Sequence, residues 1–87
     1  MTRAAANTDE TGRRLYGLMA GLLQLPEAAI SSSLTMRSVE SWDSLRHMEL
    51  IAAIEKSYAV DLTFDEIVAM QSVSEIEAVL HARGIEP

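Results

Sequence analysis

The sequence predicts an all-α fold, a small four-helix bundle with three main helices, one short helix and a long first loop. Apolar residues recur at helical spacing in three separate stretches, whereas residues 58–62 are only a weak candidate for a strand. The chain has 87 residues and is 48% hydrophobic. These values suit one small domain with a single core.

The first main helix is expected to end near Gln24. Thr8 is a capping residue followed by two acids, which suits a helix start, and Pro26 prevents the helix from continuing. Residues 26–42 then form a long connection without a sustained period. Scattered apolar side chains are expected to hold this loop against the helices: Ile30, Leu34, Met36, Val39 and Trp42.

Two capping-box patterns open the helices of the second half, because a hydroxyl residue precedes a glutamate by three positions in each. The pairs are Thr63 with Glu66 and Ser72 with Glu75. The first of these helices is short and ends near Ala69. The second is the last main helix, and Gly84 is a suitable stop for it.

The stretch 44–58 is the clearest amphipathic helix, and winding it at about 100° per residue separates two apolar stripes. One stripe must face the core: His47, Leu50, Ile51, Ile54 and Tyr58. Leu45 and Met48 fall on the far side, so we expect them to be exposed. With Glu49 at its rim, this second stripe is typical of a docking surface.

Asp43 and Ser44 lie where the loop gives way to this helix, and both residue types can cap a helix N-terminus. The positive end of the helix dipole also favours a phosphoryl group on a side chain at that place. We therefore interpret Ser44 as an attachment point. The alternative is a plain helical interaction module in which Ser44 is only an N-cap.

The same turn also suggests a hydrolase as an alternative hypothesis. Asp43, Ser44 and His47 are the residue types of a catalytic triad. The helical winding places His47 on the core face and Ser44 toward the surface. The chain also lacks a Gly-x-Ser-x-Gly nucleophile elbow. We therefore expect no enzyme.

The composition of the chain indicates which classes of partner and ligand it is expected to bind. The chain carries thirteen acids and seven bases, for a net charge of −6, which disfavours nucleic acid and favours a basic patch on a partner protein. It has no cysteine, and its histidines and acids do not show the spacing of metal ligands, so no metal site is expected.

No transmembrane helix and no signal peptide are recognised, which favours a cytoplasmic protein that does not bind membranes. We expect a monomer.

Asp43-Ser44-Leu45, at the start of an amphipathic helix after a long loop in an acidic helical domain, resembles the acyl carrier proteins. Trp42 before this motif, the run 48–55 after it, and Leu62-Thr63-Phe64 leading into a short helix also look like that family. The resemblance spans about residues 8 to 83. It implies an acyl-carrier-protein-like bundle at 9–84, with an N-terminal tail at 1–8 and a C-terminal tail at 85–87.

The resemblance further implies that Ser44 carries 4′-phosphopantetheine as a phosphodiester, with Asp43 in a supporting role. The arm would supply the thiol that this chain lacks and would carry acyl groups as thioesters. A phosphopantetheinyl transferase would modify Ser44, with magnesium bound by the transferase. Partner enzymes with basic docking patches would recognise Leu45, Met48 and Glu49. These partners would be acyl-loading, ketosynthase and acyltransferase-type enzymes.

The sequence departs from the pattern of fatty-acid carriers at two positions, which narrows the type of carrier that it resembles. The glycine usual two positions before the serine in fatty-acid carriers is Trp42 here, and the acid that commonly follows the leucine is Arg46. This form looks more like the stand-alone carriers of polyketide, specialised fatty-acid or other secondary-metabolite biosynthesis. An aminoacyl or peptidyl carrier remains the alternative, although the paired glycines typical of peptidyl carriers before the serine are absent.

Overall fold

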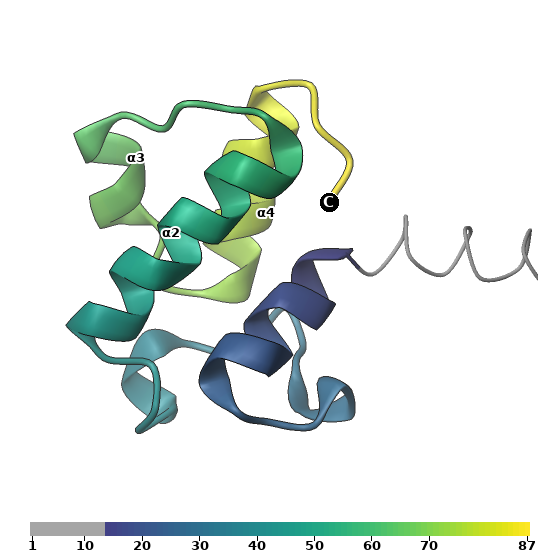
Figure 1. The fold of residues 1–87 in the computed structure, drawn as a ribbon, viewed down its shortest axis with the longest axis vertical. Helices are drawn as coiled ribbons and strands as arrows, with labels where there is room; N and C mark the ends of the chain where they lie inside the picture. Colours follow the sequence, from purple (N-terminus) through teal and green to yellow (C-terminus); the bar gives the residue numbers. More distant parts are fainter. Residues whose placement is uncertain (1–13) are drawn as a thin grey trace, which may run out of the picture.

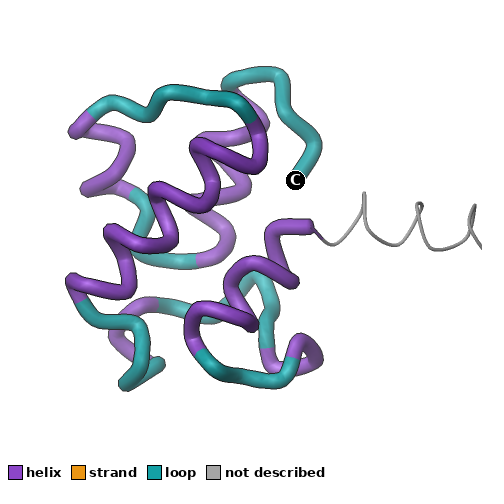
Figure 2. Tube along the Cα trace, viewed as in Figure 1, coloured by secondary structure: helices purple, strands orange, loops and turns teal. Residues whose placement is uncertain are grey.

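A computed structural model describes residues 14–87 of the chain, and the predicted start of the first helix at Thr8 lies outside this range. The elements are the first helix, described over 14–23, then η1 (Glu27–Ala29), η2 (Met36–Ser38), α2 (Ser44–Tyr58), α3 (Phe64–Ala69) and α4 (Val73–Ala82). Figure 2 shows only helices and loops in the described part of the chain, which confirms the all-α class.

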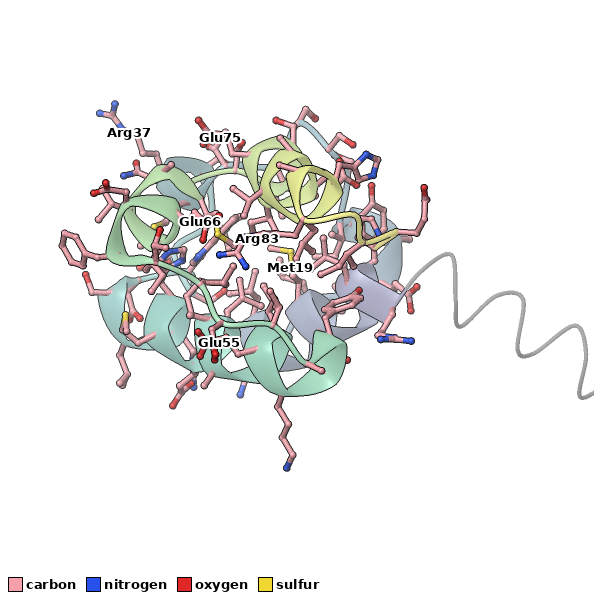
Figure 3. The ribbon with its side chains drawn as sticks, turned by 90° about the horizontal axis from the view of Figure 1, so that it is seen from above. Met19, Arg37, Glu55, Glu66, Glu75 and Arg83 are labelled. Atoms are coloured by element: carbon pink, nitrogen blue, oxygen red, sulfur yellow. The ribbon has the colours of Figure 1, made fainter. Side chains whose placement is uncertain are left out.

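The helices enclose one core. In Figure 1, α2 crosses the front of the bundle, α4 lies behind it, and the first loop closes the lower end. The first helix points Met19 into the interior (Figure 3). The fully buried side chains of the three long helices are Leu15, Met19 and Leu23, then Leu50 and Ile54, then Val73, Ile76 and Leu80.

Helix α2 has the predicted bounds and the predicted faces. Four residues of its core stripe are buried and Tyr58 is half-buried, whereas Leu45 is 67% exposed and Met48 is 55% exposed. The helix ends at Ala59, whose φ of 54° is left-handed. That reversal turns the chain away from α2. Tyr58 belongs to the helix and residues 59–62 form a turn and a loop, so the weak strand candidate is wrong.

The first loop is held against the helices as predicted. Trp42 and Ile30 are buried, and Leu34, Met36 and Val39 are half-buried. Backbone bonds add to this packing, because the Met36 N–H donates to the Gln71 carbonyl at 2.9 Å and the Val73 N–H donates to the Leu34 carbonyl at 2.9 Å. The chain between η1 and η2 is therefore anchored to the segment that precedes α4.

The two capping boxes differ in the structure. At α3, Thr63 Oγ1 accepts from the Glu66 N–H and the Glu66 carboxylate accepts from the Thr63 N–H, so that box is complete. At α4, the Glu75 carboxylate accepts from the Gln71 N–H instead of the Ser72 N–H. Ser72 forms an isolated antiparallel bridge with Thr35 of the first loop. The predicted helix start is confirmed, because Ser72 is the N-cap and its Oγ accepts from the Glu75 N–H at 3.1 Å, but the capping box at α4 is only half formed.

Gly84 stops α4 as predicted. Its φ is 77°, a left-handed value that glycine adopts without strain. This turn lets the Ile85 N–H donate to the Leu80 carbonyl at 2.8 Å, which satisfies one of the last carbonyls of the helix.

An ion pair fixes the short helix α3 to the end of α4. None of the residues of α3 is fully buried, although Ile67 is half-buried against the core. Arg83 donates from Nε to the Glu66 carboxylate at 2.9 Å, donates to the same carboxylate from Nη2, and donates to the Asp61 carbonyl at 2.8 Å (Figure 3). The hydrogen bonds that Arg83 and the Thr63 N–H donate to its carboxylate lower the pKa of Glu66 from 4.5 to about 2.

The lowered pKa of Glu66 predicts an acid-sensitive contribution to stability. Because the folded-state pKa lies below the unfolded value, the carboxylate stabilises the fold fully above pH 4.5 and progressively less as the pH falls to about 2. The urea midpoint of the native protein should therefore exceed that of Glu66→Gln at neutral pH, and the gap should close across this window. Glu86→Gln, at an exposed position, is the control, and a gap unchanged down to pH 2 contradicts the prediction.

Candidate functional site

The turn that opens α2 has Asp43 as its N-cap. The backbone of Asp43 is extended, with φ −101° and ψ −174°, and its Oδ1 accepts from the Arg46 N–H at 2.9 Å. Its carbonyl accepts from the His47 N–H at 2.8 Å. Ser44 is the first residue inside the helix. The interpretation of Ser44 as the N-cap is therefore wrong, because Asp43 already occupies the extended position from which a side chain can reach the first turn.

Asp43→Ala is expected to destabilise the domain by about 1 kcal/mol, within a range of about 0.5–2 kcal/mol for lost N-caps. The alanine side chain leaves the Arg46 N–H without its acceptor. Chemical denaturation followed by circular dichroism measures the effect. Asp43→Asn keeps a capping oxygen and should restore most of the loss; equal losses in the two variants would contradict a capping role.

The Ser44 side chain is exposed, and its hydroxyl has no hydrogen-bond partner within residues 14–87. The N–H groups of Ser44 and Leu45 lie in the first turn, where an α-helix leaves its donors without intrahelical acceptors. The hydroxyl thus stands at the positive end of a fifteen-residue helix. A negatively charged group on this oxygen would be stabilised by about 0.3–1 kcal/mol.

Beneath this turn, Trp42, His47 and the α3 backbone form a hydrogen-bonded chain. Trp42 Nε1–H donates to His47 Nδ1 at 3.1 Å, and His47 Nε2–H donates to the Ile67 carbonyl at 3.0 Å. Because Nδ1 accepts and Nε2 donates, the imidazole is the neutral Nε2–H tautomer. Trp42 is 2% exposed and His47 is 8% exposed. These two hydrogen bonds link the end of the first loop to α2, and α2 to α3.

These bonds show that His47 does not serve as a base for Ser44. Both ring nitrogens of His47 are engaged elsewhere, and no hydrogen bond joins the imidazole to Ser44 in the described chain. The Asp43 Oδ1 atom caps the helix instead of orienting the histidine. The three residue types of a triad are therefore neighbours in sequence but do not form one.

Ser44 lines an apolar groove between α2 and α3 with a volume of about 250 Å³. The other lining residues are Met36, His47, Met48, Phe64, Ile67, Val68 and Gln71. Phe64 is 76% exposed and Val68 is 49% exposed. These two residues were not predicted from the sequence to belong to the site. The available signal was the Thr63 capping box, which places Phe64 at the start of α3 and Val68 four residues later on the same face.

The three residues predicted to meet partners lie near Ser44 but differ in their contacts. Met48 lines the groove with Ser44, whereas Leu45 is exposed outside its lining. Glu49 forms an ion pair with Arg46, with 3.0 Å between Oε1 and Nη1. The prediction that Leu45 and Met48 are exposed is confirmed. Their role in recognition stays a prediction.

A larger hollow of about 630 Å³ lies between the end of the first helix and the first loop, and Ser44 does not line it. Its two serines use their hydroxyls locally, because Ser38 Oγ–H donates to the Thr35 carbonyl and Ser41 Oγ–H donates to the Leu23 carbonyl. The remaining lining is mostly aliphatic. Apart from Gln24 and Glu40 the hollow therefore offers no free polar side chain, and we place the candidate site at Ser44.

Two further features bear on the class of site. Within residues 14–87, no group of three histidine, aspartate or glutamate side chains is arranged to hold a metal ion. None of the helices in this part of the chain combines the length and apolar character needed to cross a bilayer.

A family model described as "phosphopantetheine attachment site" matches residues 13–80, well over half of the chain. The matched range contains the first loop, the turn at Ser44 and most of α4. A search among curated proteins gave no significant match.

Proposed function

Because this chain belongs to the phosphopantetheine attachment site family, whose members carry 4′-phosphopantetheine covalently on a serine, we propose that Ser44 is the attachment residue and that the protein is a stand-alone acyl carrier. The observation that carries this proposal is the Ser44 hydroxyl, which is exposed, without a hydrogen-bond partner in residues 14–87, and placed at the positive end of α2. The other serines near this turn, Ser38 and Ser41, donate their hydroxyl protons to backbone carbonyls.

The residues at the site suit a phosphodiester. Ser44 supplies the nucleophilic oxygen, and the unpaired N–H groups of the first turn favour the negative charge. Asp43 uses Oδ1 for the cap. Its other carboxylate oxygen is the part available to position the transferase or its magnesium ion, the supporting role that the family resemblance implies.

The modification is a group transfer from coenzyme A. The Ser44 oxygen forms a bond to the phosphorus that bears the pantetheine, and the pyrophosphate bond of coenzyme A breaks. The nucleotide 3′,5′-bisphosphate leaves, and the hydroxyl proton passes to a base of the transferase or to solvent. The protein's part is to present the hydroxyl on a rigid helix end with no competing hydrogen bond.

When bound, the arm supplies a thiol, which holds acyl groups as thioesters and raises their effective concentration at partner enzymes. The chain contains no cysteine that would compete for the acyl group. Trp42 and Arg46 support an assignment to polyketide, specialised fatty-acid or other secondary-metabolite assembly, because both differ from the residues usual in fatty-acid carriers. Cytoplasmic location, a monomeric state and partners with basic patches remain predictions.

Intact-mass spectrometry tests the proposal. The full chain is incubated with coenzyme A, magnesium and a phosphopantetheinyl transferase of broad specificity, and fragmentation of the product locates the added mass. The expected result is one phosphopantetheinyl group on Ser44. No gain in mass, under conditions that fully modify a known carrier, overturns the proposal; a gain on another residue overturns the assignment to Ser44.

A further inference from the structure

We propose that Met48 is a redox-sensitive site, at which a peroxide converts the thioether to a sulfoxide and thereby slows modification of Ser44. The effect on Ser44 rests on the function proposed above. In the oxidation, the sulfur lone pair attacks one oxygen of hydrogen peroxide and the O–O bond breaks. The proton of the attacked oxygen passes to the departing hydroxide, which leaves as water, so the peroxide is reduced and the sulfur is oxidised.

Met48 is the most accessible methionine among those that the structure describes. Met19 and Met70 are fully buried in the core, and the Met19 side chain points into the interior of the bundle (Figure 3). Met36 is half-buried against the core, whereas Met48 is 55% exposed. A peroxide must touch the sulfur to react with it, so oxidation follows exposure. Met48 is therefore expected to react first of these four.

Met48 also lies beside the attachment residue. It comes one helical turn after Ser44, and both residues line the groove between α2 and α3. Long side chains of an α-helix lean back toward its N-terminus, over the residue four positions earlier. This direction takes the Met48 thioether toward the Ser44 hydroxyl. Because a thioether is only a weak acceptor, the reduced side chain leaves that hydroxyl free.

Oxidation gives the Ser44 hydroxyl a strong neighbouring acceptor. The sulfoxide oxygen can accept from the Ser44 Oγ–H, which has no partner within residues 14–87. As the serine oxygen attacks phosphorus, its proton must pass to a base of the transferase or to solvent, and a sulfoxide is too weak a base to take it. The hydrogen bond to the sulfoxide must therefore break before the reaction, which lowers its rate.

The change is reversible, so it can act as a switch. Reductases that use thiols return each sulfoxide epimer to the thioether. Two thiols are oxidised to a disulfide, and the sulfoxide oxygen leaves as water. The chain has no cysteine, so no thiol of its own consumes the peroxide or reduces the sulfoxide. The response to peroxide therefore falls on the exposed thioether of Met48.

The first experiment locates the oxidation. The full chain is treated with hydrogen peroxide, samples are quenched with catalase, and fragmentation mass spectrometry follows the sulfoxide at each methionine. We expect Met48 to react at least about tenfold faster than Met19 and Met70, and also faster than Met36. A faster reaction at any of these three residues overturns the proposal. This result does not depend on whether Ser44 is the attachment residue.

The second experiment measures phosphopantetheinylation before and after peroxide, by intact mass with coenzyme A, magnesium and a transferase of broad specificity. We expect oxidation to lower kcat/KM of the native protein by about fivefold, the factor given by one hydrogen bond of ordinary strength. Circular dichroism verifies that the oxidised protein is folded, and reductases for both epimers should restore the rate. An unchanged rate, or a loss that the reductases do not reverse, overturns the proposal while the assignment of Ser44 stands.

Met48→Leu and Met36→Leu are the matched variants, because each replaces one thioether of the groove by an apolar side chain that peroxide does not oxidise. Peroxide should leave the rate of Met48→Leu unchanged, whatever its starting value, and should lower that of Met36→Leu about fivefold. Met48→Leu keeps Met1, so it also accounts for oxidation there. An equal fall in both variants overturns the proposal. If the untreated native protein is not modified, the proposed function and the effect on Ser44 both fail, and the oxidation map alone decides whether Met48 is the reactive site.

Discussion

Ser44→Ala is expected to abolish addition of phosphopantetheine while leaving the free energy of unfolding within about 0.5 kcal/mol of the native value. The loss of modification follows because alanine has no nucleophilic oxygen. The fold survives because the hydroxyl makes no hydrogen bond within residues 14–87 and the cap of α2 belongs to Asp43. Intact mass measures the first effect, and urea denaturation measures the second.

Ser33→Ala is the matched control, since Ser33 is also exposed and bonds only to the neighbouring Ser31 hydroxyl. It should be modified fully. A Ser44→Ala protein that still gains one phosphopantetheinyl group would show that another serine is the acceptor. A loss of about 1 kcal/mol or more in Ser44→Ala would instead show that the hydroxyl supports the helix start.

Trp42→Ala is expected to have the largest effect on folding, a loss of about 3–5 kcal/mol. Trp42 is the largest fully buried side chain, and it lies at the end of the first loop where it packs into the core. Its removal also leaves His47 Nδ1 without its donor. Because domains are stable by only about 5–15 kcal/mol, and small ones lie at the low end, much of this variant should be unfolded at room temperature. Urea denaturation followed by circular dichroism measures the loss.

The variant Trp42→Phe distinguishes the contribution of packing to stability from that of the hydrogen bond between Trp42 and His47. Phenylalanine fills part of the same space but donates no hydrogen bond, so the residual loss reflects the smaller ring and the unpaired nitrogen of His47. An unsatisfied buried acceptor costs about 1–3 kcal/mol, which places this variant between the native protein and Trp42→Ala. If Trp42→Ala cost less than about 1 kcal/mol, the first loop would not depend on this side chain.

Much of the fold could be predicted from local pattern. The bounds of α2 follow from one apolar stripe, because a fifteen-residue helix repeats its core positions often enough to define its face. The start of α3 follows from Thr63 and Glu66, whose two side-chain bonds depend only on residues three apart. The exposure of Leu45 and Met48 follows from the same winding, because one helix cannot turn both stripes toward a single core.

The remainder depends on contacts between distant segments, which a pattern does not contain. Asp43 and Ser44 are both able to cap a helix, and the extended backbone of Asp43 decides between them. The groove beside Ser44 requires α3 to lie against α2, and the hydrogen bond between His47 and the Ile67 carbonyl joins these two helices. The pair of Arg83 and Glu66 joins α3 to the end of α4. Phe64 therefore could be assigned to a helix from the sequence but not to the site.

The hydrogen bond between Trp42 and His47 gives the protein a built-in optical reporter. Trp42 is the only tryptophan of the chain, so its emission comes from one known place. His47 connects its indole N–H through the imidazole to the backbone of α3. Any event that shifts α3 or admits water to this turn alters the surroundings of the indole, and hence the wavelength and intensity of its fluorescence. Loading of the adjacent serine and docking of an enzyme are thus open to observation in solution without an attached dye.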